Sequence, residues 1–113
     1  MKKIKLSITG CKGRMGQQLI RSIKKDKSFK LVSLTENKKI DKKINGLKPE
    51  LNSVTAFQKA NIIIDFTVPR STIEILKIAY KLNKKVVIGT TGFSAKEENL
   101  IKNFSKKIPI LKA

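Results

Sequence analysis

The first part of the chain constrains the fold most, because it changes from strand-like alternation to helical periodicity across one glycine-rich turn. Alternating apolar and polar residues from Ile4 to Ile8 predict a strand that stops at Gly10. Beyond the turn, apolar residues recur with the spacing of an amphipathic helix, at Met15, Leu19, Ile20 and Ile23. Residues 29–35 predict a second strand. Together these segments have the pattern of a βαβ unit, in which the two strands are parallel.

A weakly patterned stretch follows this unit. Residues 36–53 are rich in Lys, Asn and Asp, so we expect an irregular excursion there. Periodicity resumes with the short apolar run at 61–66, which suits a strand covered on both faces, and Pro69 is well placed to start the next helix. Ser71 to Glu74 has the spacing of a capping box for that helix. The buried side of the helix is expected to include Ile73, Leu76, Ala79 and Tyr80.

The last third of the chain repeats the alternation of strand and helix. Residues 86–88 predict a strand, and Ser94 to Glu97 predicts a capping box at the start of another helix. The inward residues of this helix are expected to be Leu100, Ile101 and Phe104. Residues 108–111 predict a final strand.

This order of elements predicts the fold class. Strands that alternate with helices build a parallel sheet with right-handed crossovers, and helices cover both faces of the sheet. We therefore expect an α/β fold, a Rossmann-like doubly wound parallel sheet, in one domain that spans residues 1–113. Because the sequence stops after a strand with no closing helix, we expect it to be truncated before a further domain.

The formal net charge of +18 raises the question of a nucleic-acid partner. The basic residues are 23 Lys and 3 Arg, scattered as pairs, and aromatic residues make up only 5% of the chain. Stacking surfaces for bases are scarce, so we expect no nucleic-acid binding. One Cys and no His leave no ordinary set of transition-metal ligands, and we expect no metal site. No apolar run is long enough for a membrane span or a secretory signal, which favours a cytoplasmic protein without membrane contact.

Three glycines with the spacing Gly-x-x-Gly-x-x-Gly occupy the turn after the first strand. Gly10 would allow the tight turn, Gly13 would let phosphates approach the backbone, and Gly16 would let the helix pack closely on the strand. Backbone N–H groups and the helix N-terminus would then face a pyrophosphate, which predicts dinucleotide binding. The alternative is that the glycines serve only a structural turn.

Further polar residues fall at the ends of predicted strands, where doubly wound sheets bind their ligands. Glu36 is placed to accept hydrogen bonds from the adenosine ribose, and Lys38 and Lys39 are candidates to compensate a 2′-phosphate. Residues 89–92 would lie where a nicotinamide reaches. Residues 65–67 could line the same cleft, although the Asp in this segment could instead satisfy local backbone donors.

Three motifs in order resemble the dihydrodipicolinate reductase family: Gly-x-x-Gly-Arg-Met-Gly at 10–16, Asp-Phe-Thr-x-Pro at 65–69 and Ile-Gly-Thr-Thr-Gly-Phe at 88–93. The resemblance covers essentially all of this chain but only the N-terminal half of the family's usual length. It implies an NAD(P)H-dependent reduction of a cyclic dicarboxylate in lysine and diaminopimelate synthesis, with NAD or NADP as cofactor. By this resemblance the cofactor-binding residues are Gly10, Cys11, Lys12, Gly13, Arg14 and Met15 for the phosphates, Glu36 for the ribose, and Gly89, Thr90 and Thr91 for the nicotinamide side.

The same resemblance assigns no catalytic residue to this chain. In the family, the proton-donating His, the catalytic Lys and the substrate-binding Ser-Gly-Thr belong to a C-terminal α+β domain, which also forms the homotetramer. A fragment without that domain is expected to be inactive, and the substrate is expected to bind through the missing part. The chain has Asn37 where NADPH-preferring members often have Arg, which leaves recognition of the 2′-phosphate open.

Two other interpretations remain at this point. The chain could be the cofactor domain of another Rossmann oxidoreductase, such as an aspartate or homoserine dehydrogenase. It could also be a basic nucleic-acid-binding module, for which salt-dependent retention on DNA without cofactor binding would be diagnostic.

Overall fold

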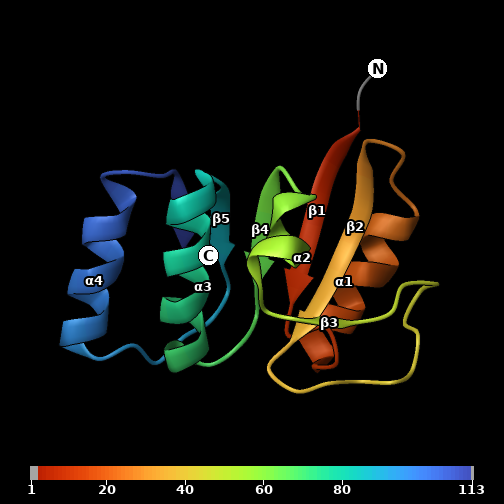
Figure 1. Cartoon of the computed structure of the whole chain (residues 1–113), viewed down its shortest axis with the longest axis horizontal. Coiled ribbons are helices and arrows are strands. Elements are labelled where there is room, and N and C mark those ends of the chain that lie inside the picture. The colour runs from red at the N-terminus through yellow and green to blue at the C-terminus, as the bar shows by residue number, and fades with distance from the viewer. Residues whose placement is uncertain (1–2, 113) are drawn as a thin grey trace.

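The computed structural model describes residues 3–112, which form a parallel sheet with helices on both faces (Figure 1). The elements are β1 (Ile4–Thr9), α1 (Arg14–Lys24), β2 (Phe29–Glu36), β3 (Glu50–Leu51), α2 (Val54–Gln58), β4 (Ile62–Asp65), α3 (Pro69–Leu82), β5 (Lys85–Ile88), α4 (Ala95–Ser105) and β6 (Ile110–Lys112). The strand order is β3-β2-β1-β4-β5-β6, and every neighbouring pair is parallel. The predicted doubly wound α/β sheet is confirmed.

Two apolar layers hold the helices on the sheet. The layer between the sheet and α1 contains Leu6, Ile8, Cys11, Ile20, Ile23 and Leu34. The layer beneath α2, α3 and α4 contains Ala56, Phe57, Ile63, Ile75, Leu76, Ala79, Val86, Ile88, Ile101 and Ile108. Because α1 returns the chain on one face and α3 on the other, the connections diverge where β1 and β4 lie side by side (Figure 1).

Helix α1 differs from its prediction at one apolar position. Ile20 and Ile23 are buried as expected, whereas Met15 is 54% exposed. Met15 lies in the first turn of the helix, and the apolar residues of α1 that contact the core begin at Leu19. The amphipathic stripe therefore begins one turn later than the sequence pattern suggested.

Helix α3 begins at Pro69, as predicted, but the expected capping box is wrong. The N-cap is Val68, so Ser71 and Glu74 lie inside the helix. The predicted buried side is also partly wrong, because Tyr80 is 48% exposed and Ile73 is only partly buried. The ring of Tyr80 packs instead against Phe104 of α4, with the ring centroids 6.2 Å apart. The residues of α3 that face the sheet are Thr72, Ile75, Leu76 and Ala79.

Helix α4 starts with the predicted capping box. The Ser94 hydroxyl accepts from the N–H of Glu97, and the Glu97 carboxylate accepts from the N–H of Ser94. Ile101 is buried and Phe104 is partly buried, whereas Leu100 is exposed, which corrects the expected inward face.

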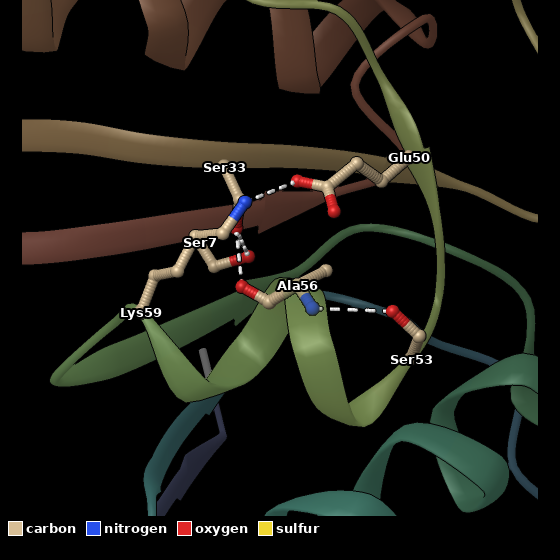
Figure 2. A network of polar contacts seen from close by, with 6 residues as sticks. All are labelled: Ser7, Ser33, Glu50, Ser53, Ala56 and Lys59. Carbon is tan, nitrogen blue, oxygen red and sulfur yellow. Dashed lines mark hydrogen bonds and ion pairs between the residues drawn. The ribbon is translucent and has the colours of Figure 1, made fainter.

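The stretch expected to be irregular contains one short strand and leads into a short helix. Strand β3 extends the sheet edge beyond β2, and Ser53 caps α2 by accepting from the N–H of Ala56 (Figure 2). On the sheet face beneath α2, the hydroxyls of Ser7 and Ser33 lie 2.6 Å apart, and Ser33 donates to the carbonyl of Ala56 at 2.8 Å. Figure 2 shows this network, which ties α2 to the sheet through buried polar side chains.

Candidate functional site

The predicted site residues gather at the carboxyl ends of β1 and β4, which point to the lower edge of Figure 1. Two adjoining hollows of about 350 and about 180 Å³ open there and share Gly13, Phe66, Thr67 and Val68. The larger hollow is also lined by Arg14, Met15, Gly16, Pro69, Gly89, Thr90 and Thr91, and the smaller one by Gly10, Glu36, Asn37 and Ser71. They form one cleft, which runs from the end of β2 past the glycine turn to the end of β5.

The glycine turn can take its shape only because two of its residues lack side chains. Gly10 has a φ of +66°, and a Cβ there would lie 2.1 Å from the carbonyl oxygen of Phe66 in the β4–α3 loop. A Cβ on Gly16 would lie 2.4 Å from the carbonyl oxygen of Gly10. Gly10 therefore makes the tight turn and Gly16 brings α1 close, as the sequence predicted.

The backbone N–H groups of the turn divide into two sets. Those of Cys11 and Gly13 donate to carbonyls of Thr35 and Gly10, and that of Lys12 donates to Glu36. The next three, on Arg14, Met15 and Gly16, donate to no acceptor within residues 3–112, and Gly13 offers no side chain to cap them. An open helix N-terminus therefore lies midway along the cleft, where unpaired N–H groups and the helix dipole favour an anion.

Two of the predicted phosphate-binding residues do not line the cleft. Cys11 is fully buried in the α1 core layer, and neither Cys11 nor Lys12 lines the cleft. Burial, followed by the negative charge of Glu36, raises the pKa of the Cys11 thiol from 9.0 to about 11. The thiol is therefore protonated near neutral pH, which suits a packing residue.

The Cys11 pKa predicts a pH dependence of stability. Because the folded pKa of about 11 lies above the unfolded value of 9.0, the thiol's contribution to stability is complete below pH 9.0 and is lost as the pH rises towards 11. Urea unfolding of wild type and Cys11→Ala across this range measures the difference. The stability advantage of wild type should shrink with rising pH, and a constant or growing advantage would contradict the assignment.

Glu36 stands at the end of β2 on the rim of the smaller hollow. One carboxylate oxygen accepts from the N–H of Lys12 at 2.9 Å, and the other accepts from the N–H of Asn37 at 3.3 Å. A carboxylate has about four acceptor positions, so two remain for further hydroxyl donors. The bond to Lys12 also joins this acid to the glycine turn.

Residues 89–91 form the other end of the cleft. A Cβ at Gly89 would lie 2.2 Å from the ring of Phe66, so a larger residue there would displace the ring. Thr90 is only 6% exposed, and its hydroxyl accepts from the N–H of Thr67 and donates to Asp65. The Thr90 side chain thus turns inward, whereas Thr91 is exposed at the rim.

The Asp65 carboxylate binds threonine hydroxyls, so the suggestion that it satisfies local backbone donors is wrong. Phe66 and Thr67 line the cleft as the motif suggested. Sequence reasoning missed Val68, which is 56% exposed and lines both hollows. An apolar residue before a proline gives no signal of such a role.

A larger hollow of about 840 Å³ lies between α4 and β6, away from every predicted site residue. It lies at the sheet edge and not at the point where the connections diverge, so we place the candidate site in the glycine-turn cleft. Within residues 3–112, no helix is long and apolar enough to cross a membrane, and no cluster of three acidic, Cys or His residues could hold a metal.

A doubly wound sheet with a glycine turn, an open helix N-terminus and an acid at the end of β2 defines a dinucleotide-binding domain. The family described as "Dihydrodipicolinate reductase, N-terminus" matches residues 4–113. The chain belongs to this family, whose N-terminal part is its NAD(P)-binding domain.

Curated relatives agree with this assignment. The chain is 66% identical over its whole length to a 4-hydroxy-tetrahydrodipicolinate reductase from Pelagibacter ubique (strain HTCC1062) and covers 44% of that protein. It is 40% identical over 98% of its length to the reductase of the same name from Bdellovibrio bacteriovorus, again covering 44%. The chain therefore spans less than half the length of the curated relatives it matches.

Solved structures show the same fold. A dipicolinate-bound dihydrodipicolinate reductase from Paenisporosarcina sp. TG-14 has a TM-score of 0.80 at 22% identity, covering 99% of this chain and 47% of its own. A homoserine dehydrogenase from S. aureus has a TM-score of 0.77 at 16% identity, covering 100% of this chain and 33% of its own. The likeness to homoserine dehydrogenase extends to the fold alone. The family match decides against the alternative that the chain is the cofactor domain of an aspartate or homoserine dehydrogenase.

Proposed function

We propose that this chain supplies the cofactor half of an NAD(P)H-dependent reduction of 4-hydroxy-tetrahydrodipicolinate to tetrahydrodipicolinate. The observation that carries the proposal is the cleft, which joins Glu36 to Thr91 across the three unpaired N–H groups at the start of α1. The family and its curated relatives support the reaction.

We assign each part of a dinucleotide to residues along the cleft. The N–H groups of Arg14, Met15 and Gly16 would hold the pyrophosphate, with the Arg14 guanidinium beside them. The two free acceptor positions of Glu36 would take the adenosine ribose hydroxyls. Gly10 and Gly13 would line the path of the phosphates, and Cys11 and Lys12 would act by shaping the turn.

At the other end, the backbone of Gly89 and Thr90 and the exposed Thr91 would meet the nicotinamide. When bound, the cofactor supplies the hydride. The residues of this chain would hold the two ends of the cofactor and keep the nicotinamide ring at the rim of the cleft. We assign them no proton transfer, and we propose that the cyclic dicarboxylate binds to the part of the relatives that this chain does not span.

We also propose that the full-length protein is a cytoplasmic homotetramer assembled through that remaining part. Size-exclusion chromatography with light scattering, applied to the full-length relative with 66% identity and to this chain, tests the assembly. A tetramer formed by this chain alone would contradict the proposal.

Cofactor binding without turnover tests the proposed function directly. In a fluorescence titration the chain should bind NADH measurably below about 1 mM, which corresponds to about 4 kcal/mol of binding free energy. It should reduce no substrate. A folded chain that binds neither NADH nor NADPH at that concentration would refute the cofactor role. Reductase activity of this chain would refute the proposal that the substrate binds to the part of the relatives that it does not span.

The choice of cofactor follows from opposing charges. Glu36 should favour the free ribose of NADH by about 1.5–3 kcal/mol, whereas each exposed Lys near a 2′-phosphate adds about 1 kcal/mol or less. We expect affinities for NADH and NADPH within about tenfold of each other, with NADPH binding weakened by salt. Titrations of wild type and the Lys38→Ala, Lys39→Ala variant at low and high salt measure this.

A matched control has the same change of charge elsewhere. Lys106 and Lys107 are an exposed pair at the end of α4, outside the cleft. Their double alanine variant should leave the ratio of NADPH to NADH affinity unchanged. An equal effect of both double variants would assign the preference to net charge, and no effect of either would show that these lysines do not bind the 2′-phosphate.

A further inference from the structure

A buried carboxylate lies next to the nicotinamide end of the cleft. Asp65, the last residue of β4, is 0% exposed. Its two oxygens accept hydrogen bonds from four threonine hydroxyls, those of Thr9, Thr67, Thr72 and Thr90. The donors belong to the end of β1, the β4–α3 loop, the first turn of α3 and the β5–α4 loop. None of the ion pairs within the described residues includes Asp65.

Stability alone does not account for an acid at this position. A carboxylate is expensive to remove from water, and its hydrogen bonds serve to offset that cost. Apolar residues occupy two of the adjacent places on the same sheet face, Ile63 on β4 and Ile88, the β5 partner of Asp65, whereas the β1 partner is Thr9. What the acid adds is a fixed arrangement, because a fully satisfied buried network specifies one geometry for its members.

Two of the four threonines, Thr67 and Thr90, line the cleft, and a hydrogen bond joins them. The Thr90 hydroxyl accepts from the N–H of Thr67 at 2.9 Å and donates to Asp65 at 3.0 Å. The Thr67 hydroxyl donates to Asp65 at 2.6 Å. Both hydroxyls therefore belong to the Asp65 network, and the residues on either side of Thr90, Gly89 and Thr91, also line the cleft.

We propose that Asp65 is a positioning residue for the nicotinamide half of the cofactor. Through Thr90 it holds the backbone of residues 89–91 against the β4–α3 loop, and through Thr9 it ties that loop to β1. This inference rests on the proposed function. It assigns to Asp65 no contact with the cofactor itself.

The experiment compares two ligands that share the adenosine half. ADP-ribose carries the adenosine, the pyrophosphate and a ribose, and lacks the nicotinamide that NADH carries. Calorimetric titrations with Asp65→Asn, which keeps the size of the side chain and removes two acceptor positions, should show NADH affinity reduced about tenfold. ADP-ribose affinity should stay within about twofold of wild type. An equal loss for both ligands, or no loss for either, would overturn the proposal.

A second variant keeps the test decisive if Asp65→Asn does not fold. Thr72→Val removes one hydroxyl donor to Asp65 at nearly constant volume, from a residue outside the cleft. NADH affinity should fall about threefold with ADP-ribose unaffected, and Thr72→Ser should restore it. Equal changes for the two ligands, or a failure of Thr72→Ser to restore NADH affinity, would count against Asp65.

Ser33→Ala is the matched control for loss of a buried hydroxyl. It breaks the bond to the Ala56 carbonyl on the same sheet face, away from the cleft (Figure 2). It should lower thermal stability without separating the two ligands. If wild type binds neither ligand, the proposed function itself fails. If wild type binds NADH no more tightly than ADP-ribose, only the role of Asp65 fails.

Discussion

Replacing Gly13 with valine is expected to abolish NADH binding and leave the chain folded. Gly13 has φ −70° and ψ 164°, a conformation that any residue adopts, and a Cβ there would meet only the Gly10 carbonyl oxygen, at 3.3 Å. The side chain would instead occupy the point where the two hollows join. We expect affinity to fall at least about a hundredfold, or about 2.7 kcal/mol.

Fluorescence titration with NADH measures the loss, and circular dichroism with thermal melting checks the fold. Gln18→Val is a suitable control, because Gln18 is exposed on α1 and lies outside the cleft. It should leave NADH affinity unchanged. Wild-type affinity in a folded Gly13→Val variant would mean that the glycine turn is purely structural.

The sequence predicts most of the sheet because its strands appear as an alternating segment or as short apolar runs between polar turns. The alternation before Gly10 predicts β1, and the apolar runs of β4 and β5 are typical of parallel strands covered on both faces. Strand β3 and helix α2 were missed for the opposite reason. A strand of two residues and a helix of five residues are too short to show a period, and their tertiary contacts decide them.

The candidate site shows the same contrast between features visible in local sequence and features that depend on tertiary contacts. The glycine spacing and Glu36 could be singled out as a candidate site because each proposed role depends on residues close in sequence. The Asp65 network could not be recognised, because its four donors come from positions between 9 and 90 and meet only when β1, β4 and β5 are aligned. Nor does the sequence show that the N–H groups of Cys11 and Lys12 bond to Thr35 and Glu36, whereas those of the three residues after Gly13 have no acceptor within residues 3–112.

Unlike Gly13→Val, which is expected to leave the chain folded, Gly10→Ala should destabilise the whole fold. The new Cβ would lie 2.1 Å from the Phe66 carbonyl oxygen, and the φ of +66° is one that only glycine adopts without cost. Overpacking costs about 1–3 kcal/mol, and the left-handed conformation costs about 1–2 kcal/mol, so the free energy of unfolding should fall by about 3 kcal/mol or more. Since small domains are stable by only about 5–15 kcal/mol, urea unfolding should show a large shift of the midpoint.

Gly46→Ala separates the two contributions. Gly46 has φ +79°, and a Cβ there would meet nothing within 4 Å, so this variant carries the conformational cost without the clash. It should lose only about 1–2 kcal/mol. The difference between the two variants then measures the contact of the β1–α1 turn with the β4–α3 loop. Equal losses would show that the two loops can move apart, and the cleft between them would then not be held by this contact.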